Sequence, residues 1–184
     1  MTLAHMRDLS EQAISLLQQG DLDGARALFQ YVLDQRVATF GADSPLIITD
    51  LANLGNVLAE LHDVAAARPL LERAVALREQ QLGPDHPELA TELGNLGLVL
   101  EEAGDPPAAR EAYERALTIQ ITAYGACHPS VGITLANLAG LLRRKGEVDL
   151  ARAAWQRADR IFERHLPPSD PARQATQAAL RNLA

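Results

Sequence analysis

Apolar positions follow a helical period along almost the whole chain. In the stretch that begins at Pro45, leucines recur every three or four residues, a spacing that places them on one face of a helix. A short turn of Gly and Asp interrupts the pattern, and a longer amphipathic stretch follows before the next turn. The pattern predicts an all-α protein built from pairs of antiparallel helices. The leucines in this first example are Leu51, Leu54, Leu58 and Leu61.

The residues that start and stop these helices recur at one constant interval, a period of about 42 residues. Proline suits the first position of a helix, and the residue before it is expected to be the N-cap. Glycine at the end of the second helix is expected to form a left-handed C-cap. The prolines are Pro45, Pro87, Pro129 and Pro171; the expected N-caps are Ser44, His86, His128 and Asp170; the glycines are Gly41, Gly83 and Gly125.

This period divides the chain into four helix–turn–helix repeats in a single domain spanning residues 1–184. The repeats are expected over about residues 3–44, 45–86, 87–128 and 129–168, with a capping helix over about residues 170–183. In the first repeat, Gln12 stands where the later repeats have Leu, which suits an end repeat with one exposed side.

Glycine also occurs inside the first helices, where it costs about 1 kcal/mol relative to Ala. Gly55, Gly97 and Ala139 occupy the same repeat position, and we expect the two helices of each repeat to cross there. A small residue at the crossing lets the backbones approach, so closer packing offsets the lower helix propensity. Gly94 lies at a different position and is expected to face a groove.

The order Leu-x2-Leu-Gly-x2-Leu, followed by Ala-x3-aromatic or Leu-x2-Ala, is the signature of the tetratricopeptide repeat (TPR). HEAT and armadillo arrays have a similar period but lack the small residue at the crossing. The second and third repeats further resemble those of kinesin light chain, because they share its Gly-Pro-Asp-His-Pro turn, its Leu-x-Asn-Leu first helix and a proline at Pro69. The resemblance implies a TPR solenoid of four repeats with a C-terminal capping helix.

Asparagine recurs at Asn53, Asn95 and Asn137, although it is a poor helix former. In a TPR stack these positions point toward the groove formed by the first helices. By resemblance to kinesin light chain, the three amides form a ladder that holds the backbone of an extended peptide. Asn56 and Thr91 are further candidates for contact with the partner. The alternative is that each Asn bonds a neighbouring repeat and only sets the stacking.

Charged residues occupy matching positions near the ends of the first helices. Glu60, Glu101 and Glu102 make the second and third repeats acidic there, whereas Arg143 and Arg144 make the fourth basic. Such charges are expected to fix the direction in which a bound partner runs. The alternative is that they serve solubility alone.

Composition narrows the partner class. The net charge of −7 argues against nucleic acid and anionic lipid, which need a basic face. A single cysteine allows no internal disulfide, and no apolar run is long enough to span a membrane, so we expect a cytoplasmic protein. The basic residues are 16 Arg and one Lys, a bias typical of GC-rich bacterial genomes.

No constellation of residues predicts catalysis, a metal site or a cofactor. Cys127 and His128 are adjacent but lack a zinc-type partner motif, and His86 and His128 are equivalent turn positions of successive repeats. Glu101 and Glu102 point about 100° apart on a helix, so a solvated surface is the simpler interpretation.

We therefore expect a non-catalytic adaptor that binds a peptide or loop of a partner protein in its groove. The resemblance extends to short bacterial kinesin light chain-like proteins associated with tubulin-like filaments, which makes such a filament a candidate partner. Two alternatives stay open: a sensor or regulatory array of a bacterial signalling protein, and a structural protein that self-assembles through its end repeats.

Overall fold

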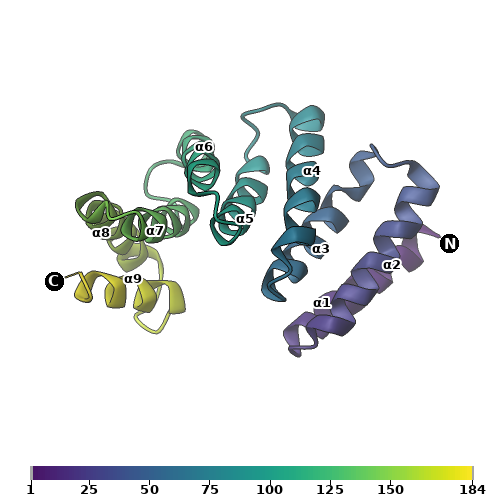
Figure 1. Ribbon diagram of the computed structural model, residues 1–184, viewed down its shortest axis with the longest axis horizontal. Coiled ribbons are helices and arrows are strands. Elements are labelled where there is room, and N and C mark those ends of the chain that lie inside the picture. Colours follow the sequence, from purple (N-terminus) through teal and green to yellow (C-terminus); the bar gives the residue numbers. More distant parts are fainter. Residues whose placement is uncertain (1, 184) are drawn as a thin grey trace. The chain divides into compact units, whose positions relative to one another are not determined.

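The structure is a computed structural model that describes residues 2–183 of the chain, and all regular structure in that range is helical. Successive helices pack in antiparallel pairs, α1 with α2, α3 with α4, α5 with α6 and α7 with α8 (Figure 1). The helices are α1 (Leu3–Gln18), α2 (Leu22–Phe40), the 3-10 turn η1 (Pro45–Ile47), α3 (Ile48–Glu60), α4 (Val64–Leu82), α5 (Leu89–Glu102), α6 (Pro106–Tyr124), α7 (Pro129–Arg144), α8 (Val148–His165) and α9 (Pro171–Arg181).

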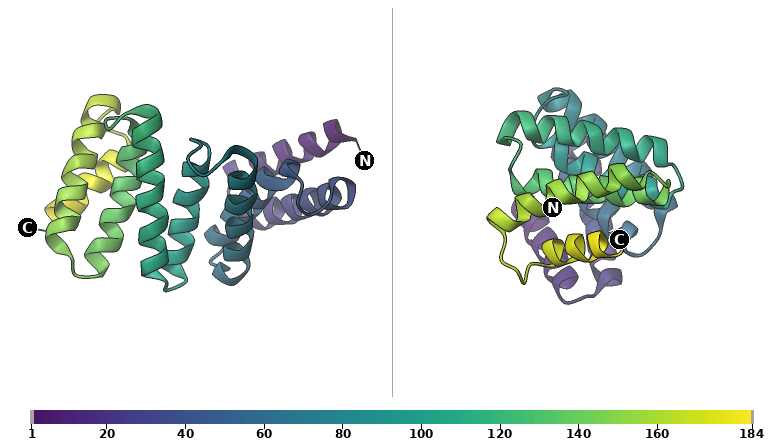
Figure 2. Two further views of the ribbon diagram at one scale, coloured as in Figure 1. Left: turned by 90° about the horizontal axis from the view of Figure 1, so that it is seen from above. Right: turned by 90° about the vertical axis from the view of Figure 1, so that its left-hand side faces the viewer.

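The chain forms two compact units, Met1–His86 (unit 1) and Pro87–Ala184 (unit 2). Their boundary coincides with the predicted boundary between the second and third repeats. Unit 1 holds two helix pairs. Unit 2 holds two pairs followed by α9, and the helices of its two pairs stand side by side in Figure 2. The predicted order of four pairs and a final helix is confirmed, whereas the single domain stays a prediction.

Three of the four predicted N-caps are confirmed. The side chains of Ser44, His128 and Asp170 each accept a hydrogen bond from a backbone N–H in the first turn that follows. The ring of His128 also stacks against Tyr124, with the ring centroids 4.8 Å apart. His128 therefore has a structural role at the turn.

The predicted start of the third repeat, a helix beginning at Pro87 with His86 as its N-cap, is displaced by two residues. Helix α5 begins at Leu89, and its N-cap residue Glu88 makes no side-chain capping bond. The Ala90 N–H instead donates to the carbonyl of Pro87 at 3.2 Å. A hydrogen bond between residues three apart closes a tight turn at Pro87, so the regular α-helix starts after the proline.

The glycines that end the second helices differ from the predicted left-handed C-cap. Gly41 and Gly125 have the expected positive φ, 89° and 87°, but their ψ angles are 160° and 157°. The left-handed helical region needs ψ near +47°, whereas this combination is open essentially to glycine alone. The chain therefore leaves each helix in an extended backbone conformation, which a residue with a Cβ atom could adopt only with strain.

Close approach of the paired helices explains the glycine inside α5. A Cβ atom at Gly97 would overlap the ring of Tyr113 on α6, and one at Gly55 would lie 2.7 Å from Leu71 Cγ on α4. The predicted crossing role of Gly97 is thereby confirmed. Gly132 on α7 has the same constraint against Phe162 on α8, a contact that the repeat signature does not include.

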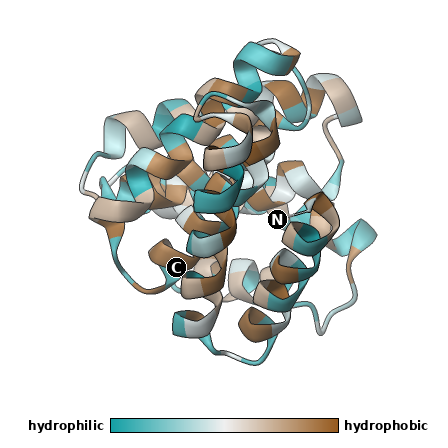
Figure 3. Ribbon diagram, turned by 90° about the vertical axis from the view of Figure 1, so that its right-hand side faces the viewer, coloured by the Kyte–Doolittle hydropathy of each residue, from teal (hydrophilic) through white to brown (hydrophobic). Residues whose placement is uncertain are grey.

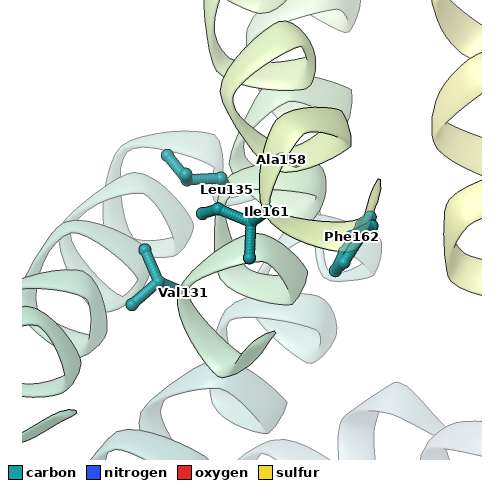
Figure 4. Close-up of a cluster of buried hydrophobic side chains, with 5 residues drawn as sticks. All are labelled: Val131, Leu135, Ala158, Ile161 and Phe162. Carbon is teal, nitrogen blue, oxygen red and sulfur yellow. The ribbon is translucent and has the colours of Figure 1, made fainter. Parts of the chain in front are cut away.

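Apolar side chains fill the space between the helices of each pair. Figure 4 shows one such cluster, in which Val131 and Leu135 of α7 approach Ile161 and Phe162 of α8. Figure 3 shows hydrophobic and hydrophilic residues interspersed along the helices. Among residues 2–183, no helix combines the length and the hydropathy that crossing a membrane requires.

A buried polar pair joins successive repeats within each unit. In unit 1, Arg36 Nη1 donates to Asp50 Oδ2 at 2.9 Å. In unit 2, Thr134 Oγ1 donates to Gln120 Oε1 at 3.0 Å. Two repeat periods separate the pairs along the chain, so they occupy the same place in the repeat. An ion pair in one unit is thus replaced by a neutral pair in the other.

The outermost helices carry polar side chains where inner helices are apolar. On α1, the residues equivalent to Val131, Leu138 and Leu141 of α7 are His5, Gln12 and Ser15, all exposed. On α9, Gln174, Gln177 and Arg181 stand at the positions that face the second helix in other repeats. Both faces are suited to water rather than to a further apolar helix.

Replacing Gly97 tests the crossing. We expect Gly97→Leu to lower the free energy of unfolding by more than the ~1–3 kcal/mol typical of overpacking, since Tyr113 leaves no room for a Cβ atom. Gly94→Ala is the matched control, because nothing lies within 4 Å of its Cβ position. That variant should be neutral or more stable by up to about 1 kcal/mol. Equal losses in denaturant melts would show that the packed face is misassigned.

Tyr113→Phe is expected to stabilise the protein. The Tyr113 hydroxyl is buried without a hydrogen-bond partner among the described residues, and burial raises the pKa of this side chain. Removing an unsatisfied hydroxyl while keeping the ring should raise the free energy of unfolding by about 1 kcal/mol. Tyr31→Phe, at an exposed position, should change little. A loss of stability on Tyr113→Phe alone would show that the hydroxyl has a partner.

Asp50 gives stability a defined dependence on pH. Burial raises the pKa of its carboxyl above the ordinary 3.8, against the opposing attraction of Arg36. The stabilising contribution of Asp50 is therefore complete below 3.8 and is lost as pH rises through the higher folded-state pKa. Melts from about pH 3 to about pH 7 should show that the free energy of unfolding of the parent falls relative to that of Asp50→Asn as the pH rises. A parent whose relative stability grows with pH would show that Arg36 outweighs burial.

Candidate functional site

Two adjacent pockets lie along the first helices of unit 2. The α5–α7 pocket has a volume of about 230 Å³, and the α7–α9 pocket has a volume of about 280 Å³. Ile133 and Asn137 on α7 line both, so the pockets share a wall. Together they form a groove, which we call the unit 2 groove.

The α5–α7 pocket is lined mainly by side chains that carry amides and hydroxyls. Its two exposed apolar side chains are Leu98 and Ile133, each about half exposed. Gly94 lies in this lining with open space around it, as predicted. The lining residues are Ala90, Thr91, Gly94, Asn95, Leu98, Gln120, Ser130, Ile133, Thr134 and Asn137.

The α7–α9 pocket is mainly apolar. Trp155 and Phe162 of α8 border it, and alanines of α7 and α9 form much of its wall. Its polar side chains are Asn137 and Thr176, of which Thr176 is buried. The lining residues are Ile133, Ala136, Asn137, Trp155, Phe162, Ala172, Ala175, Thr176 and Ala179.

The two pockets are the same place in successive repeats. One repeat period after the α5–α7 lining residues Asn95, Gln120 and Ser130 stand Asn137, Phe162 and Ala172 of the α7–α9 pocket. The asparagine of the first helix recurs in both. The second-helix residue changes from an amide to an aromatic ring, and the serine changes to alanine.

The asparagine side chains of the groove are available for a ligand. Asn95 and Asn137 are half-buried in the lining, and within unit 2 neither side-chain amide makes a hydrogen bond to a described residue. Each amide offers one acceptor and two donors. Thr91 is exposed beside them.

The predicted residues of unit 1 lie on α3. Asn53 and Asn56 are half-buried, and Glu60, the last residue of the helix, is exposed. A separate pocket of about 400 Å³ in unit 1 is bordered by Arg7, Arg36 and Leu46, together with Leu3 and Ala4 of α1. The counterparts of Arg7, Arg36 and Leu46 two periods later are Thr91, Gln120 and Ser130, so this pocket also occupies the inter-repeat position.

The charged residues at the helix ends in unit 2 are partly paired with one another. Arg144 of α7 forms an ion pair with Glu101 of α5, whose side chain is only 10% exposed. Glu102 and Arg143 are exposed. The predicted direction-setting charges therefore include one pair that also ties α5 to α7.

Several residues of the groove were missed by sequence reasoning. Gln120, Trp155 and Phe162 belong to second helices, where the apolar period assigns them to the core. Comparing equivalent positions of the repeats provides a signal, because the position of Gln120 changes from Arg36 to Phe162 across the array. Gln120 and Phe162 are both buried, so it is the change of side-chain chemistry at one repeat position that distinguishes this position from the rest of the core.

The described residues show no metal-binding geometry. Within residues 2–183, no three His, Cys, Asp or Glu side chains converge on a common point. Cys127 is exposed, and Arg164 Nη1 lies 3.9 Å from its Sγ atom.

The model of the tetratricopeptide repeat family matches three overlapping segments of the chain, residues 7–80, 49–122 and 93–164. These segments together cover most of the sequence. A comparison with curated proteins finds no match.

Solved structures resemble the fold along nearly the whole chain. Two are crystal structures of nearly identical TPR-like repeats from a Podosopora anserina protein named as a kinesin light chain. At 24% identity and a TM-score of 0.81, they match 97% of this chain and 84% and 85% of their own. The third is BtubC (BKLC) from P. vanneervenii, at 21% identity and a TM-score of 0.83, matching 98% of this chain and 72% of its own. At these identities the likeness concerns the fold.

Proposed function

Because this chain belongs to the tetratricopeptide repeat family, whose members are interaction scaffolds, we propose that it holds an extended peptide or loop of a partner protein in the unit 2 groove. Asn95 and Asn137 contact the peptide backbone, and the pocket walls contact its side chains. The chain acts as an adaptor in the cytoplasm, without catalysis of its own.

The observation that carries this proposal is the state of the asparagine amides. Both line the groove, and within unit 2 neither is used for a hydrogen bond to a described residue. An Asn that served only to stack repeats would bond across the inter-repeat contact, as Thr134 and Gln120 do. The amides therefore favour a ligand over the stacking role.

Charge at the ends of the first helices would orient the partner. Glu102 ends α5 and Arg143 lies in the last turn of α7, both exposed, so an acidic and a basic position follow one another along the array. Rim charges of this kind act on association rate and orientation more than on affinity.

A tubulin-like filament is the partner that we propose to test first. The sequence resembles kinesin light chain repeats, and the fold resembles that of BtubC (BKLC) from P. vanneervenii. Co-sedimentation with tubulin-like filaments of the source organism is the direct assay.

The alternatives have less support. Self-assembly through the end repeats would bring together the exposed polar faces of α1 and α9. Such a contact would bury little apolar surface. A sensor array would be favoured by a reading frame that joins these repeats to a signalling ATPase.

Asparagine substitutions test the groove. Once a partner is captured from the source cytoplasm, we expect Asn95→Ala and Asn137→Ala each to weaken its binding ~5- to 10-fold, mainly by faster dissociation, because one hydrogen bond contributes about 1 kcal/mol. Asn182→Ala, an exposed position after α9, is the matched control. If all three variants bind like the parent in surface-based kinetics, the partner uses another face.

A further inference from the structure

We infer that the two pockets of the unit 2 groove select different side chains of one bound peptide. The α5–α7 pocket takes a polar, uncharged side chain, and the α7–α9 pocket takes an apolar one. This inference rests on the proposed peptide-binding function and adds the chemistry of the peptide.

The α5–α7 pocket presents hydrogen-bonding groups without charge. The side-chain carbonyl of Gln120 accepts from Thr134, while its amide N–H groups donate to no described residue of unit 2. Asn95 and Asn137 add further donors and acceptors on the walls. None of the residues that line this pocket is charged. A ligand amide or hydroxyl would find partners here, whereas an ion would lose its water without a counter-charge.

The α7–α9 pocket offers few such partners. Phe162 replaces Gln120, Ala172 replaces Ser130, and Ala179 replaces Asn137, each one repeat period later. Trp155 adds a second aromatic ring to the lining. A polar side chain placed here would give up hydrogen bonds to water and regain few of them, while an apolar side chain would bury its surface.

The pocket volumes fit single side chains. Small-molecule sites usually enclose ~300–1,000 Å³. The pockets here measure about 230 and 280 Å³ and are open, so each suits one residue of a longer ligand better than a cofactor.

The spacing between the pockets limits the peptide further. Neighbouring helices pack ~8–10 Å apart, and an extended chain advances ~3.3 Å per residue. The polar and the apolar side chain should therefore be about two to four residues apart in the peptide. Asn137, which lines both pockets, lies where it can hold the backbone between them.

A display library of random peptides about 12 residues long, panned on the intact chain, supplies the probe. We expect enriched peptides to share a Gln, Asn, Ser or Thr about two to four residues from a Met, Leu or Phe. Four synthetic versions of one enriched peptide then carry either Gln or Met, which have similar shapes, at each of the two positions. The version with Gln at the polar position and Met at the apolar position should bind at least ~10-fold more tightly than the exchanged version.

The variant that tests pocket selection is the double substitution Ala172→Ser and Ala179→Asn. It gives α9 the groove residues that α7 has at Ser130 and Asn137, and both alanines are half-buried on the surface of α9. We expect the preference for Met over Gln at the apolar position to fall at least ~5-fold. Ala153→Asn, at an exposed position of α8 outside the groove, is the control and should leave the preference unchanged.

The outcomes separate this inference from the proposed function. If Asn137→Ala weakens every peptide but the double variant keeps the parent preference, the groove binds peptides and the pocket assignment is overturned. If no enriched peptide depends on Asn137, the proposed function fails and the inference fails with it. Thermal melts show whether the double variant is folded; should it be unfolded, Ala179→Asn alone is measured against the same criterion.

Discussion

The contact between a small residue on the first helix and a large residue on the second holds each repeat together. Gly97 lies directly against the ring of Tyr113, and Gly55 lies against Leu71. Because the second helix covers only the side of the first helix that carries Gly97, a neighbouring side stays open. Gly94, Asn95 and Leu98 lie on that open side and line the groove. The position of the candidate site is thus a consequence of helix crossing.

Stacking between repeats adds a second constraint, which is polar. The Arg36–Asp50 pair and the Gln120–Thr134 pair occupy one position of the repeat, at contacts that are otherwise apolar. A buried polar pair discriminates strongly against misaligned stacking, because a shifted register would leave both groups unsatisfied. The residue that meets this need in unit 2, Gln120, is also part of the groove. Under the proposed function, stability and recognition therefore depend on the same side chain.

The helix pairs could be predicted from the sequence because they depend on local signals that recur. Proline, glycine and the small crossing residue each restrict the backbone or the packing in one way. The constant period means that the same signals occur again in successive repeats. The start of α5 was misplaced, because a proline does not determine whether the first turn is a regular helix. The pockets were only half predicted. Asn95 and Asn137 stand out as poor helix formers, whereas Gln120 and Phe162 follow the same apolar period as the core, are buried like the core, and border the pockets only through tertiary packing.

The wall that Ile133 and Asn137 share between the two pockets also bears on how recognition can diverge among related repeat arrays. Under the proposed function, a substitution at Asn137 alters both pockets together, so a change that improves contacts in one pocket also changes the contacts in the other. Gln120 and Phe162 each belong to a single pocket. Under the proposed function, one pocket can therefore change independently through any residue that lines it alone, including residues of the second helices such as Gln120. A side chain that follows the apolar period of the core can in this way also determine which ligand such an array binds.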